Sequence, residues 1–285
     1  MDDRTFIPGN NLEGRAIEEE PSWELIPNQE YLDFQKIEVT EVDETKPYRP
    51  AKKVKVTKKE GEVLEVDAVT IFFVLRNKHG KELTVSAAAA GHIDNLHIKG
   101  ADAGSLFDEP SFQALMQDVA KKIPEDVATQ PGVLVIEVKM GKNIGQEGIA
   151  GLEELQDSGI LTKDDVQKAL AFKEEVIRLN RLGTKDEKEI FVKNHSDGKI
   201  KFQLIRDDVL VPVVDTPRRP TTKLYMVFVP TEQGDKKTLY TMAPGRSMPM
   251  HPNPREHMSA DGMINEKTFQ DSANAWFYTV MLVGK

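Results

Sequence analysis

Short apolar runs separated by turn residues constrain the fold of this chain more than any other feature. Residues 63–75 (VLEVDAVTIFFVL) are rich in β-branched and aromatic side chains, which is typical of a strand. The turn sequence NKHG follows at 77–80, and residues 82–87 are expected to return as the second strand of a hairpin. Further strands are predicted at 133–138, at 224–229 and 237–242 as a second hairpin around Gln233-Gly234, and at 276–282.

Two segments have the periodicity or the end signals of helices. Between residues 110 and 123 the apolar residues form one stripe, which comprises Phe112, Leu115, Met116, Val119 and Ile123. Thr162 followed by Asp165 resembles a capping box, and Gly183 is a natural stop, so one helix is predicted over 162–183. Short strands are expected around 189–193, 199–205 and 208–214.

These elements predict an α+β fold with a twisted, mainly antiparallel sheet flanked by two principal helices. The chain of 285 residues is long enough for one large domain or two ordinary ones. We expect residues 51–285 to form a single α+β domain with an inserted helical segment near 150–220. Residues 1–50 are rich in Pro, Asn and Glu, which predicts an extended acidic arm or linker.

The charge of the chain is unevenly distributed. Residues 1–50 account for −8 of the net charge of −9. Nucleic-acid binding needs a cationic face, so the acidic charge of the whole chain argues against this function. The argument is much weaker for residues 51–285, which are nearly neutral. A lysine-rich run follows at 52–59, and it is either a solvated approach to the first strand or a surface that contacts the acidic arm or a partner.

Several classes of protein are excluded or disfavoured by simple absences. The chain has no cysteine, which excludes a disulfide scaffold, a Cys-ligated zinc site and a thiol enzyme. No apolar run approaches the roughly 18 residues of a membrane span, and no secretory signal is visible at the N-terminus. We therefore expect a soluble protein without a membrane partner, acting in the cytoplasm or delivered into a target cell.

The first candidate site holds His92 and His97 in the segment AAAAGHIDNLHIKG (87–100). Two neighbouring imidazoles could act as base and acid in a proton-transfer reaction. The alternative is that one caps a helix and the other packs in the core. Their i, i+5 spacing would not place both on one face of an α-helix, which also disfavours a helical metal pair.

The second candidate site is the proline-rich segment APGRSMPMHPNPREHMSADG (243–262). Its His251, Glu256 and His257 could ligate a metal ion, although no HExxH motif is present. The alternative is a polar surface loop stiffened by proline. A third feature, GKNIGQEG at 141–148, is either an ordinary turn or a loop that offers N–H groups and Lys142 to a phosphate.

The order of several short motifs resembles one protein family. Gly91-His92, His97, Ser105-Leu106-Phe107, the predicted helix and strand, GKNIG at 141–145 and Thr241-Met242-Ala243-Pro244 follow one another. This order is similar to that of the RNase A-like C-terminal toxin domains of bacterial contact-dependent inhibition systems and related metal-independent RNase toxins. The chain departs from the pattern in about 70 residues inserted before the last hairpin, in lacking an aromatic residue just before Pro244, and in its charge.

The resemblance implies a metal-independent endoribonuclease, a toxin or effector that cleaves RNA by 2′-OH transesterification without a cofactor. It implies His92 as base or acid, with His97 as its partner or as a structural neighbour. Thr241 would orient the phosphate or a base, unless it is an ordinary strand-end hydroxyl. Lys142, Tyr240 and Arg246 would line the substrate site, with the cations stabilising the charge on the phosphorane.

Two other functions stay open at this point. The acidic arm, a faint similarity between residues 72–91 and 226–245, and the lack of a strong motif favour a non-enzymatic interaction or structural protein, such as a phage or secretion assembly component. On the first two hypotheses, an immunity or assembly protein could bind through the acidic arm. The His251, Glu256 and His257 set favours instead a metal-dependent hydrolase.

Overall fold

The computed structural model describes residues 23–31, 34–43, 51–100, 104–231, 236–259 and 262–284. The fold is α+β, with sheets dominated by antiparallel pairing, as the sequence predicts. The chain divides into two compact units instead of the single domain expected after residue 50. The described residues of unit 1 fall within 148–219 and 248–284, and those of unit 2 fall within 23–147 and 220–247.

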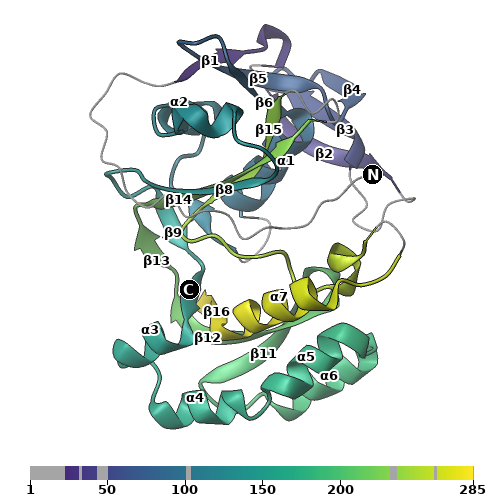
Figure 1. Cartoon of the computed structure of the whole chain (residues 1–285), viewed down its shortest axis with the longest axis vertical. Helices are drawn as coiled ribbons and strands as arrows, with labels where there is room; N and C mark the ends of the chain where they lie inside the picture. The colour runs from purple at the N-terminus through teal and green to yellow at the C-terminus, as the bar shows by residue number, and fades with distance from the viewer. Residues whose placement is uncertain are drawn as a thin grey trace. The chain divides into compact units, whose positions relative to one another are not determined.

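A six-stranded sheet forms the centre of unit 2 (Figure 1). All its neighbouring strands are antiparallel except β6 and β15, which pair in parallel and so join the two predicted hairpins. Residues 233–234, the predicted turn of the second hairpin, lie outside the described residues. In spatial order the strands are β1 (Trp23–Pro27), β5 (Ile71–Asn77), β6 (Glu82–Ser86), β15 (Lys237–Pro244), β14 (Lys223–Pro230) and β8 (Leu134–Lys139).

A second sheet in unit 2 explains the lysine-rich run. It consists of β2 (Phe34–Val42), β3 (Ala51–Lys58) and β4 (Val63–Asp67). All of these lysines except Lys59 belong to the middle strand β3, and acidic residues of both neighbouring strands lie opposite Lys53 and Lys55. Lys55 lies opposite Glu38 and Glu65, and Lys53 lies opposite Glu41 and Asp67. Part of the predicted acidic arm is therefore strand, and it does contact the lysines.

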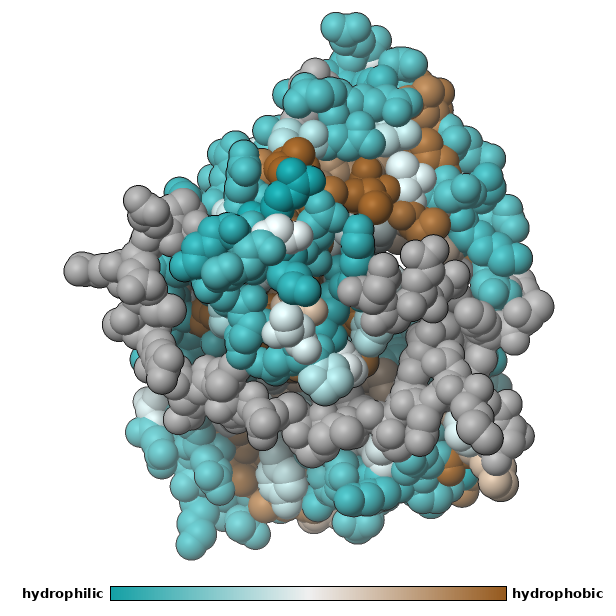
Figure 2. Space-filling model, turned by 45° about the horizontal axis from the view of Figure 1, so that its top comes forward, coloured by the Kyte–Doolittle hydropathy of each residue, from teal (hydrophilic) through white to brown (hydrophobic). Residues whose placement is uncertain are grey.

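The remaining elements of unit 2 pack against these sheets. The predicted apolar stripe of α2 (Phe112–Ala120) is buried, and the Trp23 indole donates to the carbonyl of Ile123 at 3.1 Å. Hydrophilic residues dominate the described surface in the view of Figure 2, because the apolar side chains fill these cores. The other elements are η1 (Gln29–Tyr31), α1 (Ala87–His92), η2 (Ile93–Ile98), β7 (Leu106–Phe107), η3 (Glu125–Ala128) and β9 (Gly145–Glu147); β9 pairs with β13 (Arg219–Thr221) as well as with β7.

Unit 1 contains a four-stranded sheet with β12 at its centre. Its strands are β10 (Ile149–Gly151), β16 (Thr279–Gly284), β12 (Val209–Pro217) and β11 (Ile200–Ile205), and β12 pairs in parallel with β16. The Asn180 side chain joins the helices to this sheet, because its amide bonds both the N–H and the carbonyl of Leu210 at 2.8 Å. The helical elements are α3 (Leu152–Asp157), α4 (Lys163–Leu170), α5 (Lys173–Leu182), α6 (Lys185–Asn194), η4 (Arg206–Asp208), η5 (Pro254–His257) and α7 (Glu266–Tyr278).

Three predictions for unit 1 differ from the structure. The helix expected over 162–183 breaks between α4 and α5, although its predicted capping box between Thr162 and Asp165 is present. Residues 189–193, predicted as a strand, lie in α6, which begins with a capping box between Thr184 and Glu187. The strand expected at 276–282 begins only at Thr279, because α7 continues to Tyr278.

Candidate functional site

The structure brings His92 and His97 together in unit 2. Their ring centroids lie 5.6 Å apart, with the ring planes at 70°. The N-cap Ser86 begins α1 by accepting a hydrogen bond from Ala89 N, and α1 continues directly into η2. Since η2 is a π-helical turn with i→i+5 hydrogen bonds, a spacing of five residues returns side chains to the same side. The expectation that this spacing would separate the two imidazoles is therefore wrong.

One imidazole has a defined tautomer. His97 Nδ1 lies 3.0 Å from the backbone carbonyl oxygen of Ser105. A carbonyl oxygen only accepts hydrogen bonds, so Nδ1 carries the proton, and Nε2 is the lone-pair nitrogen whenever the ring is neutral. The Ser105 carbonyl therefore holds the ring in the tautomer whose Nε2 can accept a proton.

Thr241 lies on β15, the strand that packs against both α1 and η2. A β-bulge shifts the register of β15 at Tyr240, so that Leu239 pairs with Phe228 and Thr241 with Val227. The bulge turns Thr241 to the opposite face of the sheet from Leu239 and leaves Tyr240 61% exposed. The Thr241 Oγ1 atom is buried, and the described residues offer it no hydrogen-bond partner.

A buried hydroxyl without a partner is uncommon in a native fold. The predicted alternative is an ordinary strand-end hydroxyl. Such a hydroxyl would donate to a nearby carbonyl or lie exposed to water. The structure instead leaves a polar group that a bound ligand or a water molecule could satisfy.

The two cations predicted to bind phosphate are each held by a carboxylate. Lys142 Nζ lies 2.6 Å from Asp118 Oδ2 on α2, and this hydrogen bond lowers the pKa of Asp118 and raises that of Lys142. Glu147 is buried, and one of its oxygens accepts hydrogen bonds from Arg246 N at 2.9 Å and from Arg246 Nε at 2.7 Å. A phosphate would have to replace these carboxylates to bind either cation.

The structure does not assemble the alternative metal site. Across the described ranges, no group of three or more His, Asp or Glu side chains is placed to hold a metal ion. His257 donates from Nε2 to the His251 carbonyl at 2.9 Å, and its Nδ1 lies 3.2 Å from Thr268 Oγ1. The His251 ring packs edge-on against Trp276, at 4.6 Å between centroids. Both nitrogens of His257 are thus engaged in holding the segment on unit 1.

Glu256 in this segment has an unusual environment. Burial raises its pKa to about 7, while Arg206 lowers it and Asp207 raises it further. Burial also lowers the pKa of His257, and the bond to the His251 carbonyl opposes that shift. Glu256 therefore titrates near neutral pH as a single carboxyl group, without metal-ligand partners.

Sequence reasoning did not identify a pocket in unit 1. It is about 350 Å³ in volume and lies where α4 breaks into α5, beside the turn from α6 to β11. Its lining includes Phe172, His195 and Phe202. No sequence motif signals this pocket. The pocket forms at the helix break at Phe172, and the caps and periodicity of this segment predict one continuous helix without a break.

No family model matches this chain, and no curated protein or solved structure matches it either. Within the part of the chain that the structure describes, no helix has the length and apolar character needed to cross a membrane.

Proposed function

We propose that unit 2 is a metal-independent ribonuclease in which His92 and His97 perform general acid–base catalysis. The observation that carries this proposal is the 5.6 Å separation of the two rings, with the tautomer of His97 fixed by the Ser105 carbonyl. A base and an acid at this separation suit a reaction that removes one proton and supplies another.

In the proposed reaction, His97 Nε2 takes the proton from an RNA 2′-hydroxyl group. The 2′-oxygen then attacks the adjacent phosphorus and forms a 2′,3′-cyclic phosphate, while the bond from phosphorus to the 5′-oxygen breaks. Protonated His92 donates its proton to the leaving 5′-oxygen. Protons and charges balance without a metal ion or an external reactant.

The other predicted residues have supporting roles in this proposal. The Thr241 hydroxyl would donate to a phosphate oxygen, which gives its buried Oγ1 the partner that the described residues lack. Arg246 or Lys142 would stabilise the charge on the phosphorane after exchanging its carboxylate partner for the phosphate. Tyr240 is an exposed ring beside Thr241 on which a base could stack.

The test is RNA cleavage in the presence of EDTA. We expect cleavage by the full chain, with a 2′,3′-cyclic phosphate product and no cleavage of DNA, which lacks the attacking hydroxyl. His92→Ala and His97→Ala should each lower the rate by about 10²- to 10⁴-fold. His79→Ala is the matched control, since His79 is an exposed imidazole in the β5–β6 turn of the same unit.

Intact RNA after incubation with micromolar protein would refute the proposal. Cleavage that EDTA abolishes would also refute it, because the mechanism assigns no step to a metal. Thr241→Val should lower the rate without unfolding unit 2, and Thr238→Val on the same strand serves as its control.

A further inference from the structure

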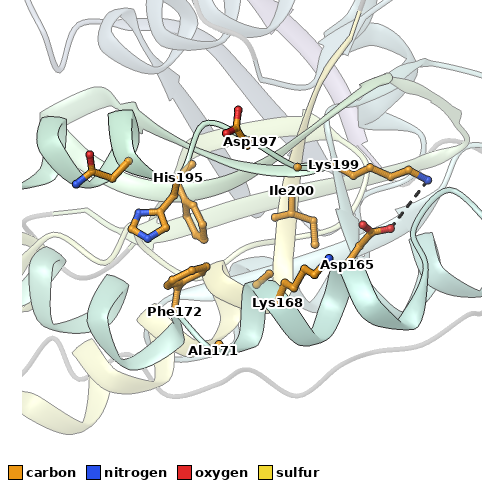
Figure 3. A pocket seen from close by; sticks show the side chains of 12 residues that line it. Asp165, Lys168, Ala171, Phe172, His195, Asp197, Lys199 and Ile200 are labelled. Atoms are coloured by element: carbon orange, nitrogen blue, oxygen red, sulfur yellow. Dashed lines mark ion pairs between the residues drawn. The ribbon is translucent and has the colours of Figure 1, made fainter.

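The pocket in unit 1 has an aromatic end and a polar end. Figure 3 shows Phe172 and His195 together at one end, and the ion pair between Lys199 and Asp165 at the other. The break between α4 and α5 supplies Phe172, and residues just after α6 supply His195. The pocket belongs to unit 1 alone, so it is independent of the histidine pair in unit 2.

Four rings build the aromatic end. The centroids of Phe172 and His195 lie 4.3 Å apart, and those of Phe172 and Phe202 lie 6.1 Å apart. Phe191 lies behind His195 at 4.2 Å and is buried, which supports the imidazole from the core side. Phe172 and His195 are only partly buried, so their rings offer apolar contact to a ligand in the pocket.

The orientation of His195 is fixed by its backbone surroundings. Its Nδ1 donates to the carbonyl of Phe191 at 2.8 Å, so Nε2 is the acceptor nitrogen in the neutral ring. The backbone N–H of His195 also donates to the Phe191 carbonyl, and this hydrogen bond caps the C-terminal end of α6. A ring held at both backbone and side chain needs little reorganisation to receive a ligand.

The lining presents donors and acceptors in balance. Lys168 and Lys199 contribute ammonium groups, Asp165 and Asp197 contribute carboxylates, and Asn194, which precedes His195 in the chain, contributes an amide. Asp165 already accepts from Thr162 in the capping box of α4, and Lys199 donates to the carbonyl of Ile160 at 3.1 Å. The lining has no excess of either charge, so it does not favour a polyanion.

We propose that this pocket binds a planar heteroaromatic ring of the nucleobase class, with its face on the Phe172 ring, whose plane lies at 62° to that of His195, and its edge toward the polar end. A nucleobase combines a stacking face with hydrogen-bond donors and acceptors along its edge. A purely apolar ring would desolvate polar groups of the lining without offering them any hydrogen bond of its own. A volume of about 350 Å³ suits a small ligand of this size.

The same ring could come from a free nucleoside or from a base in a single strand. Adenosine and uridine test the first source, and a hexameric oligothymidylate DNA tests the second. The DNA has no 2′-hydroxyl groups, so the proposed ribonuclease reaction does not affect the measurement. Benzyl alcohol serves as the comparison ligand, because its aromatic ring carries no hydrogen-bonding nitrogen or carbonyl groups along its edge.

Binding to the full chain is followed by NMR, using the ring resonances of His195, with affinities from titration. We expect nucleoside dissociation constants of roughly millimolar size and weaker binding of benzyl alcohol. Phe172→Leu should weaken nucleoside binding by about 5-fold or more, because it removes the ring but keeps an apolar side chain. Phe172→Tyr keeps the ring and should retain binding, and Tyr278→Leu is the control for an exposed aromatic residue of unit 1.

Each outcome decides the proposal. Nucleoside binding that Phe172→Leu weakens and Phe172→Tyr preserves supports it, and binding of the DNA alone with the same sensitivity assigns the site to a base in a strand. No binding of nucleosides or DNA at about 10 mM ligand overturns it. Binding unaffected by Phe172→Leu, or benzyl alcohol binding as tightly as the nucleosides, also overturns it. Thermal melts of each variant establish that the fold is intact.

Discussion

The imidazole rings of His92 and His97 lie 5.6 Å apart because a π-helical turn follows α1. In an α-helix, five residues correspond to about 500° of rotation, which would turn one ring well away from the other. The wider turn of η2, with its i→i+5 hydrogen bonds, reduces this offset. The arrangement of the candidate catalytic pair therefore depends on the position of α1 and η2 against the neighbouring sheet.

The close packing of α1 against β2 depends on Gly91. A Cβ atom at residue 91 would lie 2.7 Å from Cγ2 of Ile37 on β2. We expect Gly91→Ala to destabilise unit 2 by about 1–3 kcal/mol through overpacking, measured by urea unfolding. The same Gly91→Ala substitution should cost less unfolding free energy when it is made in an Ile37→Ala background, because the smaller side chain leaves room for the new methyl group. Strictly additive effects would show that the two residues are not coupled.

The pH dependence of unit 1 should depend on Glu256. Its folded-state pKa of about 7 lies above the ordinary value of 4.5, so the fold favours the neutral carboxyl. The resulting stabilisation is complete below pH 4.5 and is lost as the pH rises through 7. Glu256→Gln should match the natural protein near pH 4 and exceed its stability by about 1–3 kcal/mol at pH 8.

Urea unfolding followed by tryptophan fluorescence can measure this difference. The chain has two tryptophans, and Trp276 lies in unit 1 beside His251, so a Trp23→Phe background reports on unit 1. Glu175→Gln, at an exposed position of α5, is the control and should change stability equally at both pH values. A constant difference for Glu256→Gln across the pH range would contradict the assignment.

Asn180 should be essential to the packing of the helices on the sheet of unit 1. Its buried amide satisfies both backbone groups of Leu210, so Asn180→Ala would leave a donor and an acceptor without partners. We expect a loss of about 2–4 kcal/mol in the free energy of unfolding. Gln167→Ala on the exposed side of α4 should cost less than about 0.5 kcal/mol in the same experiment. Equal losses would mean that the amide is not structural.

Lys142 and Arg246 should differ sharply in their contribution to stability. The ion pair of Lys142 with Asp118 is exposed, so Lys142→Ala should cost less than about 1 kcal/mol. Arg246→Ala leaves the buried Glu147 carboxylate with fewer partners and should cost about 3 kcal/mol or more. Glu147→Gln combined with Arg246→Ala should recover part of this loss. Similar costs for the two single variants would show that Glu147 is better solvated than the structure indicates.

Much of the local structure follows from sequence patterns that tertiary packing leaves intact. The stripe from Phe112 to Val119 is buried as its spacing predicts, and the β5–β6 hairpin forms around its predicted turn. The strand predicted at 63–75, however, is divided between β4 and β5, which belong to different sheets. The alternation of apolar and charged residues in β3 was also present, with Val54 and Val56 fully buried. The density of lysines obscured that strand, because the acids that neutralise them lie on other strands.

The features that define the candidate sites depend on packing that one sequence does not reveal. Nothing in the segment from Ala87 to Ile98 distinguishes a π-helical turn from an α-helix. The strand predicted at 189–193 rested on β-branched and aromatic residues, but the capping box at Thr184 and the burial of Phe191 favour α6. Likewise, Phe172 interrupts a good helix to join an aromatic cluster whose members come from four separate elements or turns.

The acidic neighbours of β3 have a practical consequence for anyone who shortens this protein. Removing the first fifty residues as a dispensable leader would delete β2, and Lys53 and Lys55 would each lose the glutamate on that side. The trimmed chain would present these ammonium groups with acidic neighbours on β4 alone, and it would adhere more readily to polyanions, including RNA. Such adsorption would imitate substrate recognition, so nuclease assays require the intact polypeptide.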